Sequence, residues 1–393
     1  MHIIQLLLMS LVDYDNSEIP NYLIEICRDD MRVKLEDVCE RGSSNLKQSD
    51  IADAHGDYPI YGASGYIGNV NFYHQEKPYV AVVKDGAGIG RTTLHPAKSS
   101  VIGTMQYLIP KENVLPEYLC YVVRYMHLEK YFTGATIPHI YFKDYKNEQF
   151  NLDSLEEQAK IVDVLGECEK IIAEREEESR KLDDLIKARF VELFGDPIEN
   201  PKGWDVATVG KLVTEVRYGT SSPAVDGGQY PYLRMNNLTY DGHIDLSDLK
   251  YIDVPDEEKE KCVVRKGDVL FNRTNSVELV GKTAVFDLPE EMIIAGYIIR
   301  VRLGERILPE VFSQYMNLEA LKDILRSMAK GAVNQANINA QELQSIKIYV
   351  PDMELQKEFI VIKDQIDKSK VVVQKALAET QKLFDSLMQK YFG

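Results

Sequence analysis

The sequence contains few of the side chains that hold metal ions or form disulfide frameworks. Among its 393 residues are five cysteines and seven histidines, and no two cysteines form a C-x-x-C pair. No histidine stands near a cysteine at ligand spacing. Scattered cysteines of this kind argue against a zinc site and against disulfides, and they indicate a reducing compartment. We expect them to be small buried side chains.

A long uninterrupted apolar run is also missing. The opening segment Ile3–Val12 is apolar but is broken by Gln5 and Ser10, and it has no basic flank. A helix needs about 20 apolar residues to span a bilayer. We therefore expect a cytoplasmic protein with no membrane partner.

The sequence lacks complete signatures of common enzymes. Gly86–Gly90 has the spacing G-x-G-x-G, and Arg91 occupies the place of the third glycine of a dinucleotide-binding loop, so a turn between strands is favoured. Residues 280–283 (VGKT) resemble the end of a P-loop, but Ser276 stands where its first glycine is required. We also find no paired-histidine metal motif, no G-x-S-x-G elbow and no amino-methyltransferase signature. These absences predict no catalytic residue, no metal and no cofactor on this chain.

A basic excess, which would indicate binding to nucleic acid, is missing as well: the formal net charge is −16. The acidic residues are unevenly distributed, however. Residues 1–30 carry a net charge of −5 and residues 151–200 carry −8, whereas residues 31–150 and 351–393 are neutral. Both globular parts could therefore still present basic faces.

What the chain does contain is an internal repeat. The segment 155–195 returns as 353–393, with Gln158 matching Gln356 at an offset of 198 residues. Gly134-Ala135 and Gly331-Ala332 precede the two copies, and residues 115–117 (LPE) return as 308–310. The chain therefore reads as two tandem copies of a globular part followed by a long helix.

The repeat predicts an α+β fold, with two tandem globular α/β domains and two long helices that would bury their apolar seams against each other. The predicted domains are 31–152 and 196–350, and the predicted long helices are 153–195 and 351–393. Residues 1–30 form a leader of uncertain status: they are either an appended element or a gene-start artefact with Met31 as the natural start. Strands are expected at 79–83, 101–109 and 296–303, and shorter helices at 116–132 and 309–325.

The second long helix shows the clearer pattern. A 4-3 spacing that starts at Leu355 meets ten positions as far as Leu387, and eight of them are apolar. This spacing is typical of a coiled-coil seam. The first long helix has apolar stripes only near its ends (Ile161, Val164, Ile171; Leu182, Leu185), and its charged middle predicts a solvated face. At about 1.5 Å per residue, each helix would be a rod of nearly 60 Å.

The loops carry side chains suited to reading bases. Arginine pairs with guanine, and asparagine or glutamine pairs with adenine, through two hydrogen bonds. Such residues in Gly-rich turns can also simply cap and solvate the turns, but they cluster in both halves. The candidate DNA-binding residues are Tyr61, Ser64, Lys84, Arg91 and His139 in the first half, and Arg234, Asn236, Asn237, Arg273, Asn275, Lys282, Asn334 and Gln335 in the second.

On these features, residues 31–393 resemble the DNA specificity (S) subunit of type I restriction–modification systems. The resemblance rests on the tandem halves together with short motifs, namely YPIY at 58–61, YPY at 230–232, KGDVL at 266–270 followed by Arg273, LEEQ at 155–158, MELQ at 353–356, and LFGDP at 193–197. The sequence departs from the family pattern in the leader and at 82–86, where VVKDG stands in place of a KGD-type motif.

This resemblance implies a mechanism. Each globular part would be a target recognition domain that reads one half of a bipartite site in double-stranded DNA. The two long helices would pack as an antiparallel coiled coil, in a pseudo-two-fold arrangement, and act as a spacer that sets the distance between the halves. B-DNA advances about 34–36 Å per turn, so such rods would suit half-sites about one to two turns apart. The helices would also dock two methyltransferase (M) subunits and, through them, the restriction (R) subunits. S-adenosylmethionine, ATP and Mg²⁺ would belong to those partners.

Two other readings remain open from the residues alone. The chain could be a coiled-coil scaffold that binds other proteins, for which the acidic charge is an argument. It could also be a DNA methyltransferase or nuclease whose site has no recognisable motif.

Overall fold

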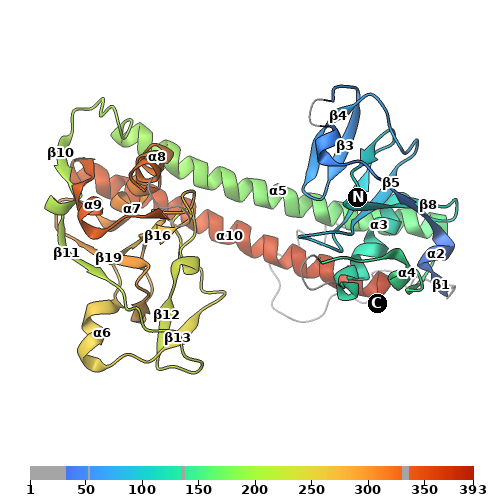
Figure 1. Ribbon diagram of the computed structural model, residues 1–393. Helices are drawn as coiled ribbons and strands as arrows, with labels where there is room; N and C mark the ends of the chain where they lie inside the picture. Colours follow the sequence, from blue (N-terminus) through green and yellow to red (C-terminus); the bar gives the residue numbers. More distant parts are fainter. Residues whose placement is uncertain (1–31, 52–53, 134–137, 330–335) are drawn as a thin grey trace. The chain divides into compact units, whose positions relative to one another are not determined.

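A computed structural model describes residues 32–51, 54–133, 138–329 and 336–393. The chain divides into two units (Figure 1): the first comprises the described residues up to Ile171 together with Glu379–Gly393, and the second comprises Ile172–Ala378. The leader and both Gly-Ala pairs of the repeat lie outside the described residues. The domain boundaries expected from the sequence stay predictions.

Two helices of 40 residues occupy the segments that the repeat marked: α5 (Leu155–Phe194) and α10 (Met353–Phe392). Each begins in one unit and ends in the other. Gly195 follows α5 with a φ of 89°, the left-handed conformation in which glycine commonly terminates a helix. That the two helices form one coiled coil along their length stays a prediction.

The larger β-sheets of the first unit have the strand orders β2-β8-β5-β6 and β4-β3-β7. All five residues of the central strand β5 (Tyr79–Val83) are buried. Side chains alternate across a strand, so Val80 and Val82 pack with the helices while Tyr79 and Ala81 pack on the opposite face. The other strands are β2 (Cys39–Ser43), β3 (Tyr58–Gly62), β4 (Gly65–Val70), β6 (Thr92–His95), β7 (Ser100–Val101) and β8 (Met105–Pro110).

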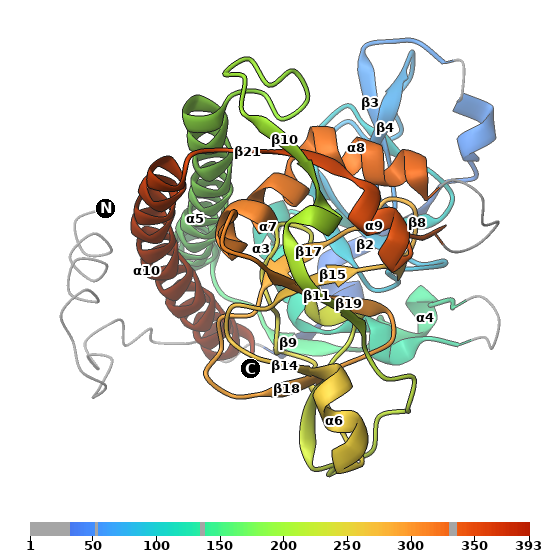
Figure 2. The same ribbon diagram turned by 90° about the vertical axis from the view of Figure 1, so that its left-hand side faces the viewer.

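The second unit repeats this plan with two four-stranded sheets, in the orders β11-β19-β15-β17 and β13-β12-β18-β14 (Figure 2). Its central strand β15 (Val269–Asn272) is buried on both faces. The other strands of these sheets are β11 (Val213–Tyr218), β12 (Tyr230–Leu233), β13 (Lys250–Ile252), β14 (Val263–Val264), β17 (Thr283–Val285), β18 (Met292–Ile294) and β19 (Ile298–Leu303). β16 (Thr274–Asn275) and β20 (Ala336–Asn337) form a separate antiparallel pair.

A short antiparallel strand pair leads into each long helix. In the first unit β1 (Arg32–Lys34) pairs with β9 (Gln149–Asn151), and in the second β10 (Asp205–Thr208) pairs with β21 (Lys347–Val350). The shorter helices are α2 (Leu35–Val38), α3 (Pro116–Tyr125), α4 (Phe142–Tyr145), α6 (Asp256–Cys262), α7 (Pro309–Asn317), α8 (Glu319–Met328) and α9 (Ala340–Ser345).

Two predicted helices are shorter than the sequence pattern suggested. The helix expected at 116–132 ends at Tyr125, because His127 has a φ of 50° and a 3₁₀ turn follows. The helix expected at 309–325 is interrupted at Leu318, whose extended backbone separates α7 from α8. Apolar periodicity continued across both breaks, so it could not reveal them.

The core of each unit includes residues from both long helices. In the first unit Ile161 of α5 and Met388 and Tyr391 of α10 are buried in one cluster. In the second unit the ring of Phe359 in α10 lies 5.4 Å from that of Phe190 in α5. The start of one helix therefore accompanies the end of the other in each unit, so the two segments run in opposite directions there.

The burial pattern along α10 follows the predicted seam closely. Nine of its ten positions are buried or partly buried, and Ser369 alone is exposed. At that point the buried position moves to Lys370. In α5, Leu185 of the predicted stripe is 40% exposed, and Ile186 is buried in its place.

A buried glutamine fixes the start of each long helix. Gln158 donates from Nε2 to the carbonyl oxygens of Asn113 and Asp153, and its Oε1 accepts from the backbone N–H of Leu115. Gln356 repeats this pattern with the carbonyls of Arg306 and Pro351 and the N–H of Leu308. Both side chains are fully buried. This explains why glutamine recurs at the offset of the repeat.

The four cysteines in the described part of the chain, namely Cys39, Cys120, Cys168 and Cys262, are free and buried. Burial raises the pKa of the Cys120 thiol to about 11. These cysteines are therefore core side chains, as expected from their spacing, and Cys27 lies outside the described residues.

Replacement of Gln356 by leucine should destabilise the second unit. Two carbonyl groups and one N–H would lose their partner in the interior, so we expect the free energy of unfolding to fall by about 2–4 kcal/mol. Chemical denaturation of the purified chain would measure this loss. Gln374→Leu, at an exposed position of the same helix, serves as the control and should change stability by less than about 0.5 kcal/mol.

Replacement of Tyr391 by alanine should destabilise the first unit although the residue lies at the end of the chain. Tyr391 is 2% exposed in that unit's core, and such a truncation costs about 3–5 kcal/mol. Hydrogen exchange should show lost protection in β5 and β8 and unchanged protection in β15 and β19. Equal loss in both sheets, or the same loss with the exposed control Lys382→Ala, would contradict this assignment.

Candidate nucleic-acid interface

In the first unit the predicted DNA-binding residues surround the loop of residues 84–91 between β5 and β6. Gly86, Gly88 and Gly90 all have φ values between 81° and 84°, a conformation that favours glycine. The loop leads into a strand, not a helix, so the G-x-G-x-G sequence forms a turn between strands, as predicted.

Two sets of contacts bring the candidates to this loop. Arg91 donates from Nη1 to the carbonyl oxygen of Ala63 at 3.1 Å, which places it beside the β3–β4 turn that contains Ser64 and follows Tyr61 of β3. On the other side His139 contacts the carboxylate of Asp85, and the ammonium of Lys84 lies 3.8 Å from the same carboxylate. Burial, together with the charge of Lys84, holds the pKa of His139 below its usual value. Arg91 thus contacts the residue next to Ser64, and Lys84 and His139 both lie beside Asp85.

In the second unit Arg234 and Asn236 open the loop of residues 234–249 between β12 and β13, which we call the β12–β13 loop. Arg234 Nη2 donates to Asp248 Oδ2 at 2.6 Å and to its carbonyl oxygen at 3.0 Å. Asn236 is exposed. The loop therefore presents the Arg234 guanidinium, which is restrained by Asp248, and the exposed amide of Asn236.

Arg273 and Asn275 lie on the segment that follows β15. Arg273 donates from Nη1 to the carbonyl oxygen of Gly296, and its guanidinium carbon lies 4.9 Å from the ring centre of Tyr218. The ring of Tyr218 is 43% exposed, and that of nearby Tyr297 is 49% exposed. Aromatic rings can stack on bases or sugars. Neither tyrosine was among the predicted residues, although each stands beside a glycine in the sequence.

Two predicted base-reading residues require correction. Asn237 is 1% exposed: its Oδ1 accepts from the N–H of Arg234, and its Nδ2 donates to the carbonyl of Asp245. Lys282 is 6% exposed and donates to the carbonyl of Met235 at 2.7 Å. Neither side chain has surface to offer a base, so we remove both from the candidates. Asn334 and Gln335 lie outside the described residues.

The KGD motif before β15 has a structural role. Gly267 has a φ of 94°, and the buried Asp268 accepts hydrogen bonds from the N–H of Arg265 and from Nε of Arg302. Arg300, which is fully buried, contacts Glu215 and the carbonyl of Val263. This network holds the sheet whose strand β15 ends beside Arg273.

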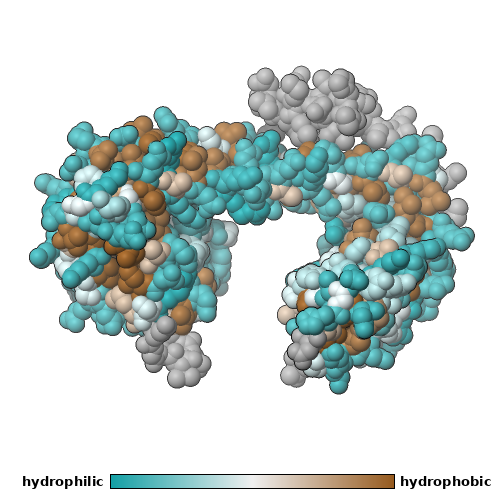
Figure 3. All heavy atoms as spheres, turned by 90° about the horizontal axis from the view of Figure 1, so that it is seen from above, coloured by the Kyte–Doolittle hydropathy of each residue, from teal (hydrophilic) through white to brown (hydrophobic). Residues whose placement is uncertain are grey.

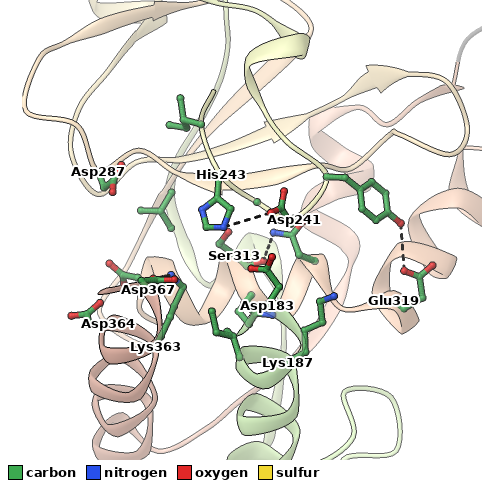
Figure 4. A pocket seen from close by; sticks show the side chains of 18 residues that line it. Asp183, Lys187, Asp241, His243, Asp287, Ser313, Glu319, Lys363, Asp364 and Asp367 are labelled. Atoms are coloured by element: carbon green, nitrogen blue, oxygen red, sulfur yellow. Dashed lines mark hydrogen bonds and ion pairs between the residues drawn. The ribbon is translucent and has the colours of Figure 1, made fainter. Parts of the chain in front are cut away.

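A cavity of about 300 Å³ lies in the second unit between the β12–β13 loop, α7 and the two long helices. Figure 4 shows His243 and Asp241 of the loop facing Asp183 of α5, with Asp364 and Asp367 of α10 beside them. The ligand atoms of Asp183, Asp241 and His243 lie within 4.8 Å of one another, as in a metal site.

A lysine already supplies the positive charge of this cluster. The ammonium of Lys370 contacts Asp183, lies 3.1 Å from His243 Nε2, and lies 3.8 Å from Asp241. Burial and the charge of Lys370 lower the pKa of His243, which favours the neutral ring. We therefore interpret the cluster as an internal ion network.

Charged and polar side chains also cover much of the surface outside these loops (Figure 3). The charged middle of α5 forms ion pairs within the helix, such as Arg175–Glu178 and Arg180–Glu177. Hydrophilic residues dominate the face drawn in Figure 3, with apolar patches on both units. In the described part of the chain, no helix is long and apolar enough to cross a membrane.

Solved structures of other proteins have a similar fold. The S subunit of a type I restriction–modification system from M. genitalium has a similar fold, with a TM-score of 0.56 at 16% identity, over 96% of this chain and 99% of that one. At this identity the likeness shows the fold alone.

Two curated relatives are similar in sequence. A Methanocaldococcus jannaschii protein assigned as the type I restriction enzyme MjaX specificity subunit is 29% identical over 49% of this chain and 46% of its own length. The type I restriction enzyme EcoKI specificity subunit of Escherichia coli is 26% identical over 46% of this chain and 40% of its own length. In these matches the chain spans about half the length of its relatives.

The family model for the type I restriction modification DNA specificity domain matches residues 29–182 and again residues 201–380. The two matches follow the internal repeat and together cover most of the chain. The chain therefore belongs to the family of type I restriction modification DNA specificity domains.

Proposed function

We propose that this chain is the non-catalytic, sequence-specific DNA-recognition subunit of a type I restriction–modification complex. The observation that carries the proposal is that one specificity domain matches each half of the chain, while polar side chains gather on the loops of each half. Each unit would read one part of a bipartite site in double-stranded DNA.

In the first unit the reading surface would be the 84–91 loop with Tyr61, Ser64, Lys84, Arg91 and His139. In the second unit it would comprise Arg234, Asn236, Arg273 and Asn275, with Tyr218 and Tyr297 as aromatic neighbours. Arginine can bind guanine through two hydrogen bonds and asparagine can do so with adenine. The two surfaces differ in residue content, which fits two half-sites of different sequence.

The long helices would set the spacing between the half-sites and dock two methyltransferase subunits. Three exposed valines on α10 support docking: Val361, Val371 and Val372 are 57%, 63% and 68% exposed. Val361 and Val372 are separated by about three helical turns and so share one face of α10. Exposed β-branched side chains are unusual on a solvated helix and fit a face that a partner covers.

The partners would carry the chemistry. S-adenosylmethionine, ATP and Mg²⁺ would bind to the methyltransferase and restriction subunits, and this chain would contribute recognition. Because phosphate contacts dominate affinity for DNA and the chain is acidic overall, we expect weak DNA binding by the isolated chain and tight binding by the complex.

Deletion of the gene with single-molecule mapping of methylated adenines tests the function. The wild-type host should show a bipartite methylated motif that disappears on deletion and returns with the gene supplied in trans. Unchanged methylation would contradict the proposal. Capture of a partner without methyltransferase activity would then favour the scaffold reading.

Replacement of Arg273 by alanine should relax recognition in the second half-site only. Loss of one two-bond contact to a base removes about 1–3 kcal/mol of discrimination, so about tenfold or more of the preference at one base pair should disappear. Methylation assays with duplexes altered in either half-site would measure this. Arg306→Ala, which removes an exposed arginine paired with Asp205, should leave both preferences unchanged.

Replacement of Val361 and Val372 by glutamate should prevent docking while leaving the chain folded. Both side chains are exposed, so the melting temperature should change little, whereas co-purification of the methyltransferase should be lost. Gln374→Glu adds a charge on another side of the helix and is the control. Normal assembly of the double variant would show that this face is not the docking surface.

A further inference from the structure

Three lysines of the second unit are almost wholly buried. Lys282, Lys322 and Lys370 are 6%, 1% and 6% exposed, and within the described ranges no other lysine is buried. Burial of an ammonium is costly unless the group is paired or hydrogen-bonded, so buried lysines are rare. Their concentration in one unit calls for a common explanation.

All three ammonium groups contact the β12–β13 loop, although they come from three different elements. Lys282, which precedes β17, donates to the carbonyl of Met235 at 2.7 Å. Lys322 of α8 donates to the carbonyl of Tyr240 at 3.3 Å and lies 4.3 Å from the centre of its ring. Lys370 of α10 reaches His243 and Asp241. We call these three side chains the lysine cradle.

The loop that they hold is closed by its own hydrogen bonds. Thr239 N–H donates to the carbonyl of His243, and the side chain of Asn237 bonds both the N–H of Arg234 and the carbonyl of Asp245. The β12–β13 loop is thus restrained by its internal hydrogen bonds and is held in one orientation by contacts with three lysines. The cradle therefore determines where the candidate base-reading residues Arg234 and Asn236, at the start of the loop, are presented.

Lys370 gives this arrangement a connection to the long helices. It takes the buried position at which the regular seam of α10 would place Ser369, and its ammonium also contacts Asp183 of α5. One side chain thus joins α5, α10 and the β12–β13 loop. The next two residues are the exposed Val371 and Val372.

We propose that the lysine cradle consists of positioning residues for the second half-site, and that Lys370 couples the long helices to the β12–β13 loop. This inference rests on the proposed function. A shift of α10 at Val371 and Val372, such as a docked partner would impose, moves Lys370 and with it the loop that carries Arg234. Recognition of the second half-site then depends on the state of the helices.

The test uses the complete complex with methyltransferase subunits and the motif mapped for the wild type. Lys370→Met keeps the aliphatic stem and removes the ammonium. We expect the preference for the cognate second half-site over single-base variants to fall by about tenfold or more, while the preference at the first half-site stays within about twofold. Lys370→Arg keeps a cation there and should restore most of the preference. Lys357→Met, at an exposed position of α10, should change neither preference.

Comparison of the sequence preferences at the two half-sites distinguishes a positioning role of Lys370 from a general loss of stability. If methylation falls to the same extent on all duplexes with both preferences retained, Lys370 acts only in stability and the proposal is overturned. Equal relaxation at both half-sites would overturn it as well. Asp241→Asn alters the same ion pair from the loop side, at a more exposed residue. It provides a second measurement if the Lys370→Met complex fails to assemble. Unchanged preferences in the Asp241→Asn complex would also overturn the proposal. Absence of any bipartite preference in the wild-type complex would instead refute the proposed function itself.

Discussion

Burial of apolar side chains from both long helices in the core of each unit is the constraint on which the structure depends. Phe190, Phe194 and Phe359 lie in the core of the second unit, whereas Ile161, Met388 and Tyr391 lie in that of the first. Neither core is complete without the last turns of a helix that began in the other unit. The chain therefore cannot lose one helix end without opening a globular core, because the core of each unit is built on a pair of helix segments. The glutamine at each helix start adds three hydrogen bonds that fix the helix to its own unit.

Within the second unit, buried charged side chains hold the sheet and the β12–β13 loop in defined orientations. Arg300 and Asp268 hold the sheet that leads to Arg273, and the lysine cradle holds the β12–β13 loop. A hydrophobic contact tolerates sliding, whereas a charged hydrogen bond in the interior has a required distance and direction. Loops that read bases need such definition, because a displacement of about 1 Å is enough to break a two-bond contact. Among its described residues the first unit has fewer buried charges. Its 84–91 loop is held by backbone hydrogen bonds to Pro138 and Ile140.

The sequence allowed the larger features to be predicted, because they repeat. The offset that relates Gln158 to Gln356 marked both long helices, and nine of the ten positions of the 4-3 spacing in α10 are buried or partly buried. Gln356, Lys370, Met388 and Tyr391 are buried outside that spacing. Loop residues such as Arg91 and Arg273 could be named from their chemistry, although their contact with DNA stays a prediction. The interruption at Leu318 and the turn at His127 were missed because apolar spacing continues through them. The burial of Asn237, Lys282 and Lys370 was missed for another reason: their partners are carbonyl or side-chain groups far along the chain, and no local pattern encodes such pairs.

The central claim is that each half of the chain reads one half-site independently on a common helical frame. The most direct measurement is an exchange of residues 201–350 for the matching segment of a relative with a different methylated motif, followed by mapping of methylated adenines in the host. The account predicts a hybrid motif in which the second half-site is that of the donor, while the first half-site and the spacing are unchanged. A change in both half-sites, or a motif identical to that of the parent, would contradict it.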